Sequence, residues 1–262
     1  MRSFLTTSLI AAALLSATAR GDGKEPHLDI WLRPVDGAVM TGSITEGTPG
    51  TPVADRADVF AGEFGTDPKF PFAAFEPGFQ ALATGFVTSF SFEIAGPVLR
   101  FDGAAFTATA VTMTLAYGPS STTSTSGTAS GFAFNTFADG LLHDHFDYIL
   151  NGVAGADPEN GVYALPLRFS AISPAADPGN VAWVVLNAGE SESLHDAAIL
   201  RAELYLACGI DATGDGTVNA EDLAALLGAW GSDDASVDYD RSGTVDAQDL
   251  SVLLGSWGYA CD

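Results

Sequence analysis

The sequence predicts a mainly β protein, in which a β-sandwich or jelly-roll-like domain is followed by a small all-α domain. Two observations carry this prediction. Between residues 22 and 206, short runs of Val, Phe, Thr and Ala alternate with clusters of Gly, Pro, Asp and Asn, which is typical of strands and turns. Residues 208–261 contain an internal duplication with an offset of 27 residues, as the pairs Asp211/Asp238 and Trp230/Trp257 show.

The amino-terminal residues 1–19 have the pattern of a secretory signal peptide. Arg2 supplies the positive charge, Leu5–Leu15 the short apolar core, and Ala17–Ala19 an A-x-A cleavage site. No stretch reaches the roughly 20 apolar residues that a membrane-spanning helix needs. We therefore expect a secreted protein with three parts: residues 1–19, residues 20–206 (the β domain) and residues 207–262 (the tail).

The charge of the chain excludes two classes of partner. The 262 residues carry a formal net charge of −23, and Lys24 and Lys69 are the only lysines. Nucleic-acid phosphates and anionic membrane surfaces attract basic proteins. We expect neither as a partner.

The β domain is expected to contain nine strands and one late helix. The helix is predicted at Ser191–Arg201, with Ser191 or Ser193 as its N-cap. The Ser- and Thr-rich run Pro119–Ser130 is expected to form a hairpin loop. The expected strands are His27–Arg33, Val59–Phe64, Gly85–Ile94, Val98–Phe101, Phe106–Tyr117, Gly131–Phe137, His143–Leu150, Gly161–Ser170 and Val181–Asn187.

Each repeat of the tail begins with twelve residues that place oxygen-bearing groups at alternating positions. Such a loop suits Ca²⁺, which takes about six to eight oxygen ligands, and Gly216 and Gly243 stand where the chain must turn sharply. Thr217 and Thr244 would contribute their main-chain carbonyl groups. The predicted ligands are Asp211, Thr213, Asp215, Thr217, Asn219 and Asp222 in the first loop, and Asp238, Asp240, Ser242, Thr244, Asp246 and Asp249 in the second. The alternative is two solvated acidic turns.

A short amphipathic helix is predicted after each loop. Its apolar residues are spaced i, i+3, i+4 and i+7, and they are Leu223, Leu226, Leu227 and Trp230 in the first repeat and Leu250, Leu253, Leu254 and Trp257 in the second. Neither stripe can be buried alone, so we expect the two helices to pack together and to end at Gly231 and Gly258. The only cysteines, Cys208 and Cys261, are expected to form a disulfide in an oxidising compartment.

Loop–helix, spacer, loop–helix, with Asp at the twelfth position and no helix expected before the first loop, resembles a type I dockerin. The resemblance covers the tail and implies two bound Ca²⁺ ions, a cohesin-like or other surface protein as partner, and a link to polysaccharide utilisation. Two departures matter. Thr213 stands where dockerins usually have Asp or Asn. Ala220–Glu221 and Ala247–Gln248 replace the hydroxyl pair with which dockerins often recognise cohesin.

The histidines of the β domain indicate a second candidate site. His143 and His145 alternate on an expected strand, so both rings point to one face, and His27 shares a face with Asp29 on another strand. If these strands are neighbours, the candidate ligands are His27, Asp29, His143 and His145, with Glu63, Asp147 or His195 completing the set. Imidazoles with a carboxylate suit Zn²⁺, Cu²⁺, Mn²⁺ or Fe²⁺. The alternative is the solvated polar face of a half-buried strand.

The segments PHLDIWLRP, VFAGEFG, GLLHDHFDYILNG, VYALPLRF and WVVLNAGE resemble a recurrent domain of secreted bacterial proteins of unknown function. The chain has no G-x-S-x-G motif, and its cysteines are expected to be bonded, so no nucleophile is apparent and we expect no enzyme. The expected function is that of a secreted calcium-binding protein whose tail attaches the β domain to a protein or surface.

Two alternatives for the β domain remain, a His-ligated metalloenzyme and a carbohydrate-binding module. The aromatic residues that could line a sugar-binding face are Trp31, Phe70, Phe72, Phe75, Phe79 and Trp183. Large aromatic side chains dominate protein cores, so we expect most of them to be buried.

Overall fold

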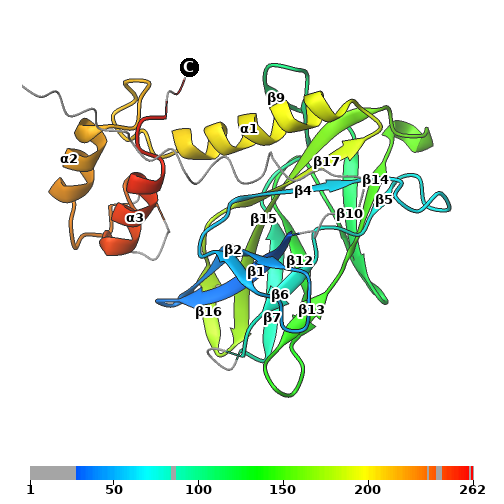
Figure 1. The fold of residues 1–262 in the computed structure, drawn as a ribbon, viewed down its shortest axis with the longest axis horizontal. Coiled ribbons are helices and arrows are strands. Elements are labelled where there is room, and N and C mark those ends of the chain that lie inside the picture. The colour runs from blue at the N-terminus through cyan, green and yellow to red at the C-terminus, as the bar shows by residue number, and fades with distance from the viewer. Residues whose placement is uncertain (1–27, 84–86, 235, 240–243, 260, 262) are drawn as a thin grey trace, which may run out of the picture.

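The computed structural model describes residues 28–83, 87–234, 236–239, 244–259 and 261. The predicted signal peptide, His27, Asp240 and Ser242 lie outside the described residues. The prediction of a mainly β protein is confirmed, because the described strands form one 13-stranded mixed sheet and one four-stranded sheet (Figure 1).

The large sheet is built around β15 (Gly161–Ser173), which pairs along its length with four other strands. Three pairs in this sheet are parallel, namely β1 with β6, β2 with β16 and β4 with β17. The other strands are β1 (Leu28–Val35), β2 (Ala38–Thr45), β3 (Pro52–Ala54), β4 (Val59–Glu63), β6 (Phe79–Ala81), β7 (Ser89–Ile94), β8 (Leu99–Phe101), β9 (Phe106–Ala108), β12 (Ala129–Asn135), β13 (Leu142–Asp144), β16 (Ala175–Pro178) and β17 (Ala182–Ala188).

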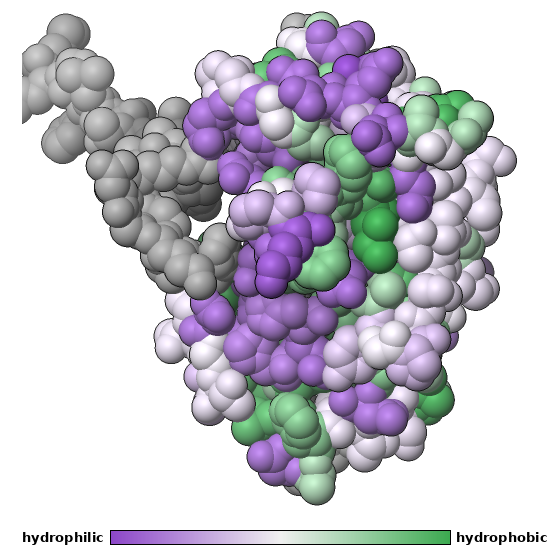
Figure 2. Space-filling model, turned by 90° about the vertical axis from the view of Figure 1, so that its right-hand side faces the viewer, coloured by the Kyte–Doolittle hydropathy of each residue, from purple (hydrophilic) through white to green (hydrophobic). Residues whose placement is uncertain are grey.

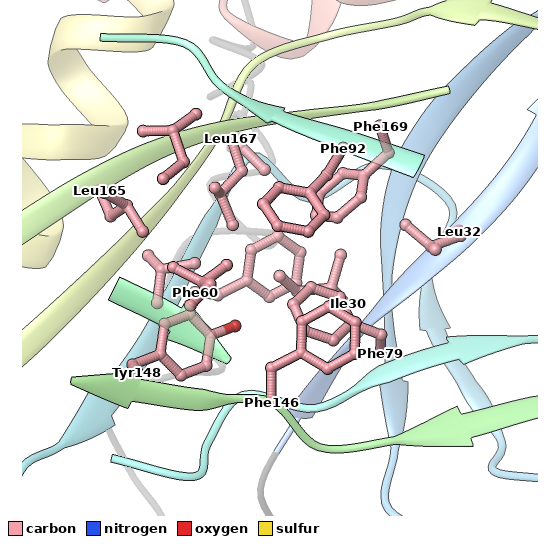
Figure 3. Close-up of a cluster of buried hydrophobic side chains, with 14 of the residues drawn as sticks. Ile30, Leu32, Phe60, Phe79, Phe92, Phe146, Tyr148, Leu165, Leu167 and Phe169 are labelled. Carbon is pink, nitrogen blue, oxygen red and sulfur yellow. The ribbon is translucent and has the colours of Figure 1, made fainter. Parts of the chain in front are cut away.

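The small sheet packs against the large one over a single aromatic core. Its strand order is β11 (Ser120–Thr123), β10 (Thr112–Tyr117), β14 (Asp147–Asn151) and β5 (Ala73–Ala74). Tyr148 from the small sheet and Phe79 and Phe169 from the large sheet are fully buried in the same cluster (Figure 3). Two sheets therefore share a core as in a sandwich, although the parallel pairs differ from an antiparallel jelly roll.

Two predicted strands are in fact divided between the sheets. The segment Phe106–Tyr117 forms β9 in the large sheet and β10 in the small one, and the segment His143–Leu150 forms β13 and β14 in the same way. At the second crossing Phe146 is fully buried, and its ring centroid lies 4.5 Å from that of Phe79. Across the second crossing Leu142, Phe146 and Tyr148 keep one phase of the alternation, so the sequence pattern cannot reveal that crossing.

Other segments depart from the expected assignment. The predicted loop Pro119–Ser130 contains β11 and the first residues of β12. The strands β2, β3, β5, β6 and β16 were not expected. Most of them are short, and β2 has no clean alternation of apolar and polar residues.

Helix α1 (Glu192–Cys208) covers the opposite face of the large sheet and leads to the tail (Figure 1). The Ser191 side chain caps it, accepting a hydrogen bond from the Leu194 N–H group at 3.4 Å. The helix runs past the expected end at Arg201, so the predicted domain boundary between residues 206 and 207 falls in its last turn. The first loop of the tail therefore does follow a helix, contrary to expectation.

The tail contains α2 (Ala220–Gly228) and α3 (Ala247–Gly255), which share a small apolar cluster centred on Leu226 and Leu253. The two repeats interlock through equivalent backbone bonds. Val218 in the first loop bonds to Gly258 and Tyr259 at the end of the second repeat. Val245 in the second loop bonds to Gly231 and Ser232 at the end of the first.

The predicted apolar stripes are buried only in part. The helices end at Gly228 and Gly255, before the expected stop residues, which follow with positive φ. The last two residues of each stripe lie outside the cluster, although Leu227 and Leu254 are still within the helices. The exposed fractions are 53% for Leu227, 47% for Trp230, 54% for Leu254 and 46% for Trp257.

Candidate functional site

The histidine cluster is assembled by three neighbouring strands. β1 and β13 pair with opposite edges of β6, so that Gln80 of β6 lies between Trp31 and His143. Asp29 comes from β1, His143 from β13, and His145 from the crossing to the small sheet. The two histidines therefore face the same side, as the sequence predicts, although they do not share a continuous strand.

The three side chains bring ligand atoms within 4.8 Å of one another. The Nε2 atoms of His143 and His145 are 3.1 Å apart, and the His143 Nε2 atom lies 3.3 Å from Asp29 Oδ2. Asp29 is fully buried, whereas the side chains of His143 and His145 are 15% and 30% exposed. The cluster thus combines a buried carboxylate with two imidazoles that solvent can reach.

The carboxylate of Asp29 is held by two donors from the neighbouring segment. The Gly78 N–H group donates to Oδ1 at 2.9 Å, and the Gln80 side-chain amide donates to Oδ2 at 2.6 Å. The fully buried Tyr148 hydroxyl donates to the Pro77 carbonyl oxygen at 3.0 Å and so anchors this segment to the core. The fold therefore fixes the position of the carboxylate.

The outer nitrogen of each ring also has a partner. The Nδ1 atom of His145 lies 3.0 Å from the Phe75 carbonyl oxygen and 3.3 Å from Glu76 Oε2. The Nδ1 atom of His143 lies 3.1 Å from the Thr48 hydroxyl. The hydrogen bond to Glu76 raises the pKa of His145 to about 9, against the opposing effect of burial. Glu76 was missed from sequence, because it lies in a connection between strands without a recognisable motif.

The other candidate ligands lie elsewhere. Glu63 and Asp147 have exposed side chains and are not in the cluster. His195 is buried in α1, with its Nε2 atom 3.2 Å from the Val185 carbonyl oxygen. His27 lies outside the described residues.

In the first loop of the tail, the predicted carboxylate ligands accept hydrogen bonds from the backbone of the loop itself. Asp211 accepts bonds from the N–H groups of Gly214 at 2.7 Å and Gly216 at 2.8 Å. Asp222 accepts bonds from the N–H groups of Thr213 at 3.0 Å and Asn219 at 2.8 Å. Burial by itself would raise the pKa of Asp222, but these hydrogen bonds outweigh it and lower the pKa.

The remaining positions of the first loop also belong to this network. Asp215 Oδ2 accepts a bond from the Asn219 amide at 2.9 Å, and the same amide donates to the Thr217 carbonyl oxygen at 2.9 Å. Asn219 caps α2 and forms a capping box with Asp222. All six predicted positions of the first loop therefore belong to one compact turn.

The described residues of the second loop repeat the helix cap and the buried carboxylate of the first. Asp246 caps α3 and forms a capping box with Asp249, as Asn219 and Asp222 do for α2. Asp249 is fully buried, like Asp222, and Asp238 is nearly so. Thr244 is exposed, while Asp240 and Ser242 lie outside the described residues.

The predicted disulfide is present. Cys208 and Cys261 are bonded, with their Cα atoms 5.3 Å apart. The Cys261 N–H group also donates to the Gly216 carbonyl oxygen at 2.7 Å. The bond therefore ties the end of α1 and the end of the tail to the first loop.

Three of the six candidate sugar-binding aromatics are buried. Phe79 is fully buried, Trp183 is 4% and Trp31 9% exposed, and only Phe70, at 54%, is largely exposed. On the face seen in Figure 2, polar and weakly polar residues cover most of the surface, and apolar residues form separate patches. Among the described residues, no helix combines the length and hydrophobicity needed to span a bilayer.

Comparisons with protein-family models, with curated proteins and with solved structures give no match.

Proposed function

We propose that this is a secreted calcium-binding protein whose tail attaches the β domain to a partner protein or surface. One observation carries the calcium proposal: Asp222 and Asp249, at the twelfth position of the two loops, are both fully buried in equivalent capping boxes. The hydrogen bonds that Asp222 accepts from Thr213 and Asn219 keep this buried carboxylate charged and fix it at the twelfth position, which is what a cation ligand requires. A divalent ion in each loop would offset the repulsion among the loop carboxylates.

The type of ligand supports a hard ion such as Ca²⁺ over a softer transition ion. The predicted side-chain ligands of the first loop offer oxygen atoms, from Asp211, Thr213, Asp215, Asn219 and Asp222. Hard cations such as Ca²⁺ bind oxygen, whereas softer transition ions prefer nitrogen and sulfur. The Asp211 carboxylate lies inside a tight turn, where its oxygens would be shared between the backbone N–H groups of Gly214 and Gly216 and a bound ion.

The attachment role rests on the apolar residues that the tail leaves exposed. Leu227 and Trp230 in the first repeat are exposed to nearly the same extent as Leu254 and Trp257 in the second. Exposed large apolar side chains, and tryptophan in particular, are typical of protein-binding surfaces. Together with the dockerin-like order of loops and helices, they support a cohesin-like or other surface protein as the partner.

Hydrogen exchange of the full chain tests whether calcium holds the tail together. Amides in α2 and α3 are expected to be protected in Ca²⁺ and to exchange much faster in EGTA with a reductant, because the carboxylates then repel one another without a disulfide to restrain them. Amides of β15 and β17 serve as an internal control and are expected to keep their protection. Equal protection of α2 and α3 in both conditions would contradict the proposal.

Calorimetric titration with type I cohesin domains tests attachment. Binding is expected in Ca²⁺, to be lost in EGTA, and to weaken at least about tenfold in the double variant Leu227→Ala/Trp230→Ala, because truncating an interface anchor costs about 2 kcal/mol or more. Leu200→Ala is the matched control, since Leu200 is 56% exposed but lies on α1. A loss of equal size in the control would contradict the assignment of the surface.

A further inference from the structure

We infer that Asp29, His143 and His145 bind one divalent transition-metal ion, with Zn²⁺ as the best match, in the β domain. The site is independent of the calcium loops, since it lies on β1, β13 and the crossing to β14. Within the described residues, these three form the group of His, Cys, Asp and Glu side chains whose ligand atoms come within 4.8 Å of one another.

The spacing of the ligand atoms fits a small ion. Two ligands that are each about 2.0–2.1 Å from a tetrahedral Zn²⁺ ion lie about 3.4 Å apart. The His143 and His145 Nε2 atoms are separated by 3.1 Å, and His143 Nε2 and Asp29 Oδ2 by 3.3 Å. Little movement of the side chains is needed to place an ion among them.

The outer hydrogen bonds direct the correct nitrogen of His145 towards the site. Its Nδ1 atom faces the Phe75 carbonyl oxygen and the Glu76 carboxylate, neither of which offers a proton at neutral pH. Nδ1 must therefore carry a proton, and a metal ion would take the place of the second proton, on the Nε2 atom that faces His143. A carbonyl or carboxylate partner on the outer nitrogen is the usual support of a metal-binding histidine.

The charge and the ligand type favour a transition ion over calcium. Asp29 is a fully buried carboxylate beside two imidazoles, and a divalent ion bound among the three would sit directly against its negative charge. The two imidazole nitrogens make the site a poor match for Ca²⁺ but suit Zn²⁺. The partly exposed rings of His143 and His145 give the ion a path from solvent and leave a coordination position for water.

The position of Gly78 shows that the cluster is tightly packed against the backbone. A Cβ atom at this position would lie 2.7 Å from the Cε1 atom of His145 and 2.9 Å from Asp29 Oδ1. Only glycine therefore allows the His145 ring and the Asp29 carboxylate to approach the same backbone segment. The backbone of that segment also donates to Asp29.

Equilibrium dialysis of the full chain against Zn²⁺, in excess Ca²⁺ to occupy the tail, tests the inference. We expect one Zn²⁺ per chain after prior treatment with a chelator. The single variants His143→Ala and His145→Ala are expected to lose more affinity than the roughly 10–100-fold typical of an outer partner, whereas Glu76→Gln is expected to fall within that range. Their folding is checked by circular dichroism.

Asp147→Asn is the matched control, since Asp147 is an exposed carboxylate two residues from His145 that lies outside the cluster. It is expected to bind Zn²⁺ like the wild type. The inference is overturned if the wild type binds no Zn²⁺, or if a folded His143→Ala/His145→Ala double variant binds as tightly as the wild type.

Discussion

Replacing Gly78 by Ala tests whether His145 and Asp29 are held as metal ligands against the backbone of Gly78. The added methyl group would overlap the His145 ring at 2.7 Å and the Asp29 carboxylate at 2.9 Å, so at least one of them must move. Overpacking of this kind costs about 1–3 kcal/mol of the free energy of unfolding. Displacing a ligand also lowers Zn²⁺ affinity, by about 10–100-fold if the change resembles the loss of an outer partner.

Urea denaturation and zinc dialysis measure the two effects separately. Gly96→Ala is the matched control, because its Cβ atom would meet the Pro166 side chain at an ordinary 3.5 Å. That variant is expected to keep both stability and Zn²⁺ affinity. A folded Gly78→Ala protein that binds Zn²⁺ as tightly as the wild type would refute the placement of His145 and Asp29 as ligands.

Three further predictions concern stability. Asn180→Ala is expected to lower the free energy of unfolding, measured by urea denaturation, by about 2–4 kcal/mol. The change removes a donor to the Asp58 carboxylate and the acceptor of the buried Thr41 N–H group. Cys208→Ser is expected to cost the tail about 4 kcal/mol, since the bond closes a loop with a sequence separation of 53; hydrogen exchange of α2 and α3 measures it. In EDTA, the free energy of unfolding is expected to fall by at most about 3 kcal/mol as the pH rises from 6.5 towards 9. Folding raises the pKa of His145, so the stabilisation is lost as the folded protein gives up this proton. Glu76→Gln should flatten this pH dependence, because it removes the main cause of the shift.

The sequence patterns predict the local structure of the tail well. The period of the apolar stripe after each loop correctly places α2 and α3, and the only two cysteines of the chain form the expected disulfide. The patterns fail where packing decides, because a stripe of four apolar residues does not show which of them the partner repeat covers. Trp230 and Trp257 are therefore exposed rather than buried.

For the β domain, period-two alternation predicts that His143 and His145 face one side. It cannot predict that β6 lies between β1 and β13, since β6 has three residues and both of its pairings are long-range. That topology brings Asp29 to the histidines. Glu76 joins the cluster from a connection, where no periodicity links a residue to its neighbours in space.

Counting the bound Ca²⁺ ions tests the central claim most directly. Equilibrium dialysis of the full chain is expected to give two Ca²⁺ per chain, and one in each of the variants Asp211→Ala and Asp238→Ala. Asp233→Asn, an exposed carboxylate between the repeats and outside the ligand positions, is the matched control and should keep two. A wild-type protein that binds no Ca²⁺, or an unchanged count in both Ala variants, would contradict the account.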